Sequence, residues 1–213
     1  IRDSYFAALY VQKDGGDAAF QNVLKQMRQW SPRHSDDGPV YLGYRLGHIE
    51  GDARAYRALV YNKGALVLHM LRGLLGDEDF FSGLRHYYSE MRFQKAGTDA
   101  LIRGFEIAAG RSLEAFFDQW IHGSELPEPQ FDYRTEARVS GAQNEEDLVL
   151  AFEQTGSIFE VPVPVRLRYQ SGEVEITVVP VTEQLTEVRI PLRDELRDVS
   201  VDETDVVLGN IRK

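Results

Sequence analysis

The sequence predicts a protein of two parts, a helical part over residues 1–126 followed by an all-β sandwich over residues 127–213. Three observations lead to this multidomain α and β class. Apolar residues recur at helical spacing as far as about residue 126, and they alternate with polar residues afterwards. The run Leu126-Pro127-Glu128-Pro129 separates the two patterns, as proline often does. The charge changes there too, because the first part carries 15 basic and 16 acidic groups and the second carries 9 and 18.

Helices of the first part follow from apolar spacing and from stop signals. Gly15-Gly16 ends the first helix, and Gly76 ends a long one. In the second half of that long helix only His69 and Arg72 are strongly polar, so it is expected to be buried on most sides. Residues 31–53 are rich in Gly, Pro and Asp and are predicted to form a loop. The expected helices are therefore 2–12, 17–30, 54–75, 77–91, 98–110 and 112–121.

Short strands of the second part follow from strict alternation of apolar and polar residues. Turn signals such as Ser171-Gly172 separate them. About seven strands of this length are typical of a β-sandwich. They are expected at 131–139, 147–153, 161–169, 173–181, 186–192, 199–201 and 206–211.

The composition argues against several classes of function. The chain has no cysteine, which excludes disulfides, thiolate metal sites and cysteine nucleophiles. A net charge of −10 repels phosphate backbones, so no nucleic-acid partner is expected. No stretch is long and apolar enough to span a bilayer, so no membrane segment is expected in this chain.

One motif carries chemical information. The segment Tyr61-Asn62-Lys63-Gly64-Ala65 leads directly into the apolar helix. It resembles the Tyr-x-Lys-Gly-Ala stretch of the aminopeptidase N family, which are zinc metallopeptidases of the gluzincin type. Further along, Thr98-Asp99-Ala100-Leu101 and Phe116-Phe117-Asp118-Gln119-Trp120 resemble later segments of that family. The resemblance is collinear over about residues 1–130, and three motifs in the same order are much more specific than one.

This resemblance implies a zinc site formed by H-E-x-x-H on one helix and by a Glu on the next. The five histidines of the chain contain no pair spaced by four residues and no His-Glu dipeptide. The chain therefore resembles the helical C-terminal half of a gluzincin catalytic domain joined to a sandwich, without the H-E-x-x-H segment. Zn²⁺ is expected in the full-length enzyme and none on this chain. The missing N-terminal part of the same protein is the expected partner, and this fragment alone is expected to be inactive.

Two tyrosines are the candidate site residues. The resemblance implies that Tyr61 is catalytic and donates a hydrogen bond to the oxyanion of the tetrahedral intermediate, which is typically worth about 3–4 kcal/mol of barrier. A tyrosine hydroxyl suits this role because a pKa of about 10 keeps it protonated at neutral pH. The alternative is an ordinary core aromatic. Tyr56 matches a substrate-binding tyrosine of some relatives, but a spacing of five residues places it on another helical face unless the segment bends. Packing is its alternative role.

The predicted function of the full-length protein is to hydrolyse N-terminal residues from peptides, so a peptide substrate is the expected partner. The alternative is a non-catalytic scaffold of the same family that binds through its acidic β-sandwich. A chance resemblance is a third interpretation, and it predicts that Tyr61 packs away from any cleft. His69 is expected to be a hydrogen-bonded core histidine rather than a metal ligand.

Overall fold

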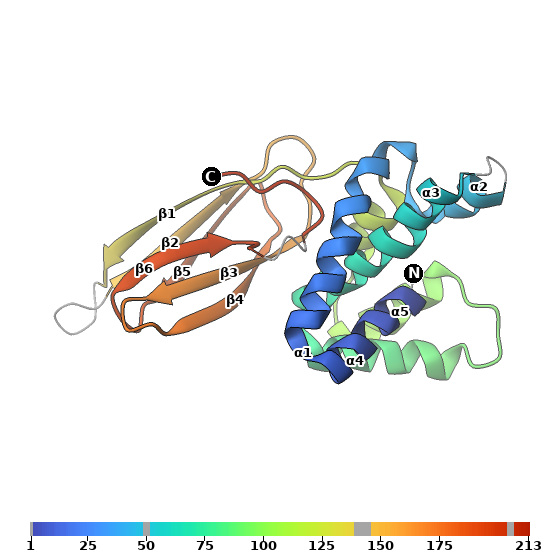
Figure 1. Ribbon diagram of the computed structural model, residues 1–213, viewed down its shortest axis with the longest axis horizontal. Coiled ribbons are helices and arrows are strands. Elements are labelled where there is room, and N and C mark those ends of the chain that lie inside the picture. The colour runs from blue at the N-terminus through green and yellow to red at the C-terminus, as the bar shows by residue number, and fades with distance from the viewer. Residues whose placement is uncertain (1, 49–51, 139–145, 204–206) are drawn as a thin grey trace. The chain divides into compact units, whose positions relative to one another are not determined.

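The computed structural model describes residues 2–48, 52–138, 146–203 and 207–213. The chain divides into two compact units, Ile1–Glu125 and Leu126–Lys213. Figure 1 shows that the first contains the helices and the second contains the strands. A helical unit followed by antiparallel β-sheets is the predicted fold class, which is confirmed.

Two long helices form the frame of the first unit (Figure 1). Helix α1 spans Arg2–Trp30 and α4 spans Gly64–Glu90. Each contains one glycine with a φ of 77°, Gly16 in α1 and Gly76 in α4. Glycine adopts this conformation without the steric cost that a Cβ atom adds. The predicted interruptions at these glycines are therefore kinks between two helical stretches.

Shorter helices complete the unit. The loop predicted over residues 31–53 is wrong in part, because short helices form within it. Helices of three to six residues are too short to show an apolar period, which explains the error. Helix α3 and the π-helix η3 then lead into α4. The bounds are η1 Pro32–Asp37, η2 Val40–Leu42, α2 Gly43–His48, α3 Ala53–Tyr56, η3 Arg57–Lys63, α5 Thr98–Ala109, α6 Glu114–Phe117 and η4 Asp118–His122.

Two glycines let α4 and α5 approach closely. A Cβ atom at Gly83 would lie 2.4 Å from Cδ1 of Phe105, and one at Gly104 would lie 2.9 Å from the carbonyl oxygen of Gly83. The Phe105 ring stacks on Phe80 with centroids 5.3 Å apart. Both rings are fully buried. This packing fixes α4, and therefore also the segment that precedes it.

The second unit consists of two antiparallel three-stranded sheets with the orders β1-β2-β5 and β4-β3-β6. Leu148, Leu150, Val163 and Val165 are fully buried in its core. The strand predicted over 206–211 is wrong: from residue 207 onward the structure contains only an isolated bridge between Gln130 and Arg212. The bounds are β1 Gln130–Ala137, β2 Glu146–Glu153, β3 Val161–Tyr169, β4 Val174–Val181, β5 Leu185–Pro191 and β6 Leu196–Val201.

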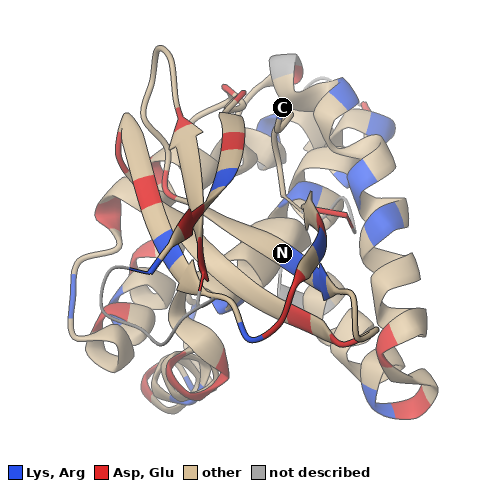
Figure 2. Cartoon of the chain, turned by 90° about the vertical axis from the view of Figure 1, so that its left-hand side faces the viewer, with Lys and Arg blue, Asp and Glu red and all other residues tan. Residues whose placement is uncertain are grey.

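Part of the negative charge of the second unit is balanced by ion pairs. Figure 2 shows basic positions beside acidic ones on its strands. Glu136 accepts hydrogen bonds from the guanidinium groups of Arg134 at 2.7 Å and Arg189 at 2.6 Å. Arg168 bonds Asp198 at 2.9 Å. The formal charge therefore overstates how strongly this surface attracts cations.

Candidate active site

Tyr61 lies on η3, and 43% of its surface is exposed. The amide of Gly64 donates to the carbonyl of Leu59, five residues earlier, which is the hydrogen bond of a π-helix. Such a helix has more residues per turn than an α-helix and occurs often at functional sites. A partly exposed tyrosine on an irregular helix is an arrangement that suits a hydrogen-bond donor to substrate.

The π-helix brings Tyr56 against Tyr61. Their ring centroids are 5.6 Å apart and the ring planes meet at 78°, an edge-to-face contact. Burial, and next the neighbouring Tyr61 hydroxyl, raise the pKa of Tyr56. The five-residue spacing was expected to separate the two side chains unless the segment departs from a regular α-helix, and the π-helix is such a departure.

Helix α2 holds this pair through two glycines. A Cβ atom at Gly47 would lie 2.9 Å from Cδ2 of Tyr56, and one at Gly43 would lie 2.0 Å from Cγ2 of Val60. Only glycine permits this approach. The imidazole of His48 lies edge-on to Tyr56, with centroids 6.3 Å apart. Sequence reasoning missed α2, although two glycines spaced by four residues are a signal of close helix packing.

Lys63 ends η3 and is fully buried. Its Nζ donates to the carbonyl oxygen of Gly123 at 3.4 Å. Gly123 follows η4, where its amide donates to Asp118, again five residues back. Lys63 therefore connects the two π-helical segments. Burial lowers the pKa of Lys63 to about 8, because the charged ammonium is poorly solvated there.

A polar network within the helical unit joins α1 to α4. The hydroxyl of Tyr5 lies 3.1 Å from Nδ1 of His69, and burial lowers the pKa of His69 to about 4. Burial also raises the pKa of Tyr5 to about 12. Arg72 donates to both carboxylate oxygens of Asp77, at 2.6 and 2.8 Å. His69 is thus a partly buried residue that is hydrogen-bonded to Tyr5, as expected for a histidine with a structural role.

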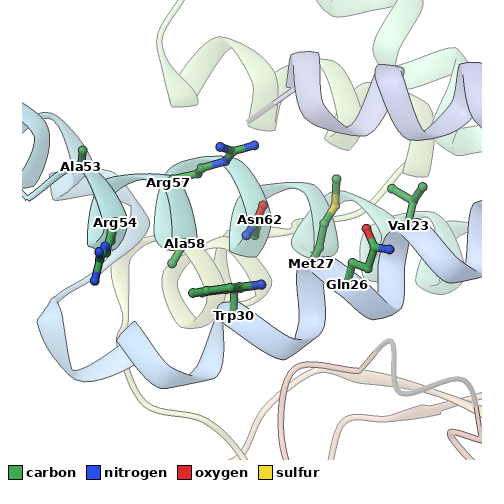
Figure 3. Close-up of a pocket in the computed structure, with 9 residues that line it drawn as sticks. All are labelled: Val23, Gln26, Met27, Trp30, Ala53, Arg54, Arg57, Ala58 and Asn62. Carbon is green, nitrogen blue, oxygen red and sulfur yellow. The ribbon is translucent and has the colours of Figure 1, made fainter.

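A groove of about 670 Å³ runs along the other side of the Tyr61 segment. It lies between the second half of α1 and the residues of α3 and η3. In Figure 3 the Trp30 indole lies between these helices, below Ala58 and Asn62. The groove is therefore formed partly by the same π-helix that carries Tyr61.

Neither a metal site nor a membrane helix occurs in the described part of the chain. No three His, Asp or Glu side chains come close enough there to hold a metal ion. The described residues thus do not fit the zinc ion that the family resemblance implies. In the same residues, no helix combines the length and apolarity needed to cross a membrane.

A family model matches this chain within the helical unit. The peptidase family M1 domain matches residues 9–120, more than half of the chain. An aminopeptidase N of Lactococcus lactis subsp. lactis is 26% identical over 132 residues, and that of Caulobacter vibrioides is 30% identical over 112. These matches cover 62% and 52% of this chain. They cover only 15% and 13% of those relatives, so the chain spans a small part of their length.

A solved structure supports the fold. It is that of Legionella pneumophila aminopeptidase A in complex with aspartic acid, with a TM-score of 0.56 at 15% sequence identity. The similarity covers 76% of this chain and 18% of that one. The family resemblance predicted from the Tyr61-Asn62-Lys63-Gly64-Ala65 motif is thus confirmed: the chain belongs to peptidase family M1, with relatives named aminopeptidase N.

Proposed function

We propose that the protein hydrolyses N-terminal residues from peptides and that Tyr61 stabilises the transition state. Family membership supports the reaction class. The observation that carries the role of Tyr61 is its position, because its half-exposed ring lies on a π-helix and is braced by Tyr56. An ordinary core aromatic would be buried, whereas Tyr61 is 43% exposed.

Peptide hydrolysis begins when water adds to the scissile carbonyl carbon, and the carbonyl oxygen becomes an oxyanion. The Tyr61 hydroxyl donates a hydrogen bond to that oxygen, which carries more charge in the transition state than in the substrate. The C–N bond then breaks, and the amine leaves with a proton. Because the ring is fixed before the reaction, little reorganisation is needed.

The remaining parts of the site support this donor. Tyr56 forms a wall beside the substrate, and α2 fixes the ring of Tyr56 through Gly47. Lys63 anchors the end of the π-helix to Gly123. The family implies a zinc ion in the full-length protein. The described residues do not fit one, so any ligands of that ion would lie outside them.

A binding role without catalysis is a second candidate, and one observation favours it. The outward side of β4 carries Val174, Ile176 and Val178, whose surfaces are 54%, 61% and 39% exposed. This apolar row lies on an edge strand of its sheet, where another chain could pair. A scaffold that binds through the sandwich could use this row together with the acidic groups around it.

Zinc content and turnover of the full-length protein test the proposed function. We expect about one zinc per chain, together with release of the fluorophore from an aminoacyl-fluorophore substrate. A chelator should abolish turnover and added zinc should restore it. Full-length protein that binds no zinc and cleaves neither the fluorophore nor short peptides would support the scaffold instead. Residues 1–213 alone are expected to be inactive.

A further inference from the structure

The groove between α1 and the α3–η3 segment has a mixed lining that the proposed role of Tyr61 does not use. Its apolar floor includes Met27, Ala58 and the indole of Trp30, which is 53% exposed. Two amide side chains, Gln26 and Asn62, add donors and acceptors. A volume of about 670 Å³ is in the usual range for ligand sites.

Two guanidinium groups give the groove its charge. Arg54 and Arg57 line it, and none of its lining residues is acidic. Within the described part of the chain, neither guanidinium has an ion pair. The nearby carboxylate of Asp52 accepts the backbone amides of Arg54 and Ala55, both at 3.0 Å, and also interacts electrostatically with the Arg54 side chain. Because the lining contains two guanidinium groups and no acidic side chain, the groove favours an anion.

The π-helix that forms part of this groove also carries Tyr61. In a π-helix, residues four and five positions apart stand beside one another on the surface. Arg57 therefore neighbours both Tyr61, four residues on, and Asn62, five residues on. In Figure 3 the Arg57 side chain extends along the upper side of this helix, while Arg54 points down on the opposite side. A chain bound in the groove could thus continue toward Tyr61.

We propose that the groove binds a segment of the peptide substrate that carries a carboxylate next to an apolar side chain. The inference rests on the proposed function. One of the two guanidinium groups, Arg54 or Arg57, which point to opposite sides of the helix, binds the carboxylate, because a guanidinium presents paired donors that match its two oxygens. The Trp30 indole packs against the apolar side chain. Gln26 and Asn62 bind the peptide backbone.

Binding of labelled peptides to the full-length protein tests this site directly. Fluorescence anisotropy is measured with peptides that carry a fluorophore on their N-terminus, which an aminopeptidase cannot cleave. One peptide contains Phe-Glu and has an amidated end, and its neutral match contains Phe-Gln. A third peptide ends in Phe with a free carboxylate. The first and third peptides distinguish an acidic side chain from a chain terminus as the source of the carboxylate.

We expect at least one carboxylate peptide to bind about tenfold more tightly than the neutral match. A charged hydrogen bond contributes enough binding free energy for this difference in affinity. The double variant Arg54→Gln/Arg57→Gln should bring this ratio to about one. The control Arg33→Gln/Arg85→Gln removes two exposed charges outside the groove and should keep the ratio. Equal binding of all three peptides by the unmodified protein would overturn the proposal, and so would an unchanged ratio in the Arg54/Arg57 variant.

Turnover separates this proposal from the proposed function. An aminoacyl-fluorophore has no peptide beyond the scissile bond, so its kcat/KM should not change in the Arg54→Gln/Arg57→Gln variant. The turnover of this substrate could instead fall severalfold, or the melting temperature could fall by many degrees. Either result would mean that the two arginines stabilise another part of the protein and that the groove is not a peptide site. The role of Tyr61 is unaffected by either result.

Discussion

The phenol ring of Tyr56 meets that of Tyr61 edge to face, with centroids 5.6 Å apart and planes at 78°. Five residues separate them in the chain, which in an α-helix corresponds to a rotation of about 140°. The π-helix Arg57–Lys63 removes most of this rotation, because its hydrogen bonds join residues five apart. The Tyr56–Tyr61 contact therefore depends on the π-helical hydrogen bonding of this segment and on the contacts that stabilise it.

Gly47 is one such support, and substituting it should disturb substrate binding. In Gly47→Val the new Cβ would meet the Tyr56 ring at 2.9 Å, so the ring must shift. We expect KM for an aminoacyl-fluorophore to rise about threefold to tenfold, and stability to fall by about 1–3 kcal/mol as for other overpacked sites. Steady-state kinetics well below the melting temperature check this. Gly97→Val is the matched control, because nothing lies within 4 Å of a Cβ atom there. Equal kinetics in both variants would mean that Tyr56 does not contact substrate.

Because of Lys63, the free energy of unfolding should increase as the pH becomes alkaline. The folded state lowers the pKa of Lys63 to about 8 from the ordinary 10.5, so between these values the unfolded chain binds more protons. Stability therefore rises as the pH rises from about 8 to about 10.5. Lys63→Met removes the buried charge, and we expect it to raise stability at pH 7 by about 1–3 kcal/mol.

Thermal unfolding of the full-length protein from pH 7 to 10 provides the measurement for Lys63. The difference in melting temperature between Lys63→Met and the unmodified protein should be largest at pH 7 and should shrink toward pH 10. A difference that stays constant with pH would show that the Lys63 ammonium is well solvated or paired, contrary to its burial in this structure.

His69 should make the free energy of unfolding decrease at acidic pH. Burial lowers the pKa of His69 to about 4 from 6.5, so the unfolded chain binds the proton first. The stability that this group contributes is present above about pH 6.5 and is lost as the pH falls to about 4, with a total of about 3 kcal/mol. His69→Gln should unfold with a weaker pH dependence in this window. His86→Gln, on the exposed side of α4, should leave the dependence unchanged. Identical pH profiles for all three proteins would contradict a buried neutral His69.

Long periodic elements could be predicted from the sequence, and irregular ones could not. The alternation of Val161 to Tyr169 and the apolar run after Gly64 each repeat long enough to define one period. A π-helix has no such signature, since one additional residue in a turn leaves no mark in the apolar pattern. The contact of Lys63 with Gly123 joins residues 60 positions apart, and a lysine is normally expected at the surface. Tyr61 was identified by its motif, whereas the role of α2 required the structure.

Tyr61 is the residue on which the proposed function depends, through its stabilisation of the transition state of peptide hydrolysis. Steady-state kinetics of Tyr61→Phe in the full-length protein test it most directly, because this change removes one hydroxyl and keeps the ring that packs on Tyr56. Tyr10→Phe is the control, since Tyr10 is 67% exposed and lies on α1 outside the site. We predict that kcat for an aminoacyl-fluorophore falls about 10²–10³-fold with little change in KM. A kcat within about threefold of the Tyr10→Phe control would contradict this role of Tyr61.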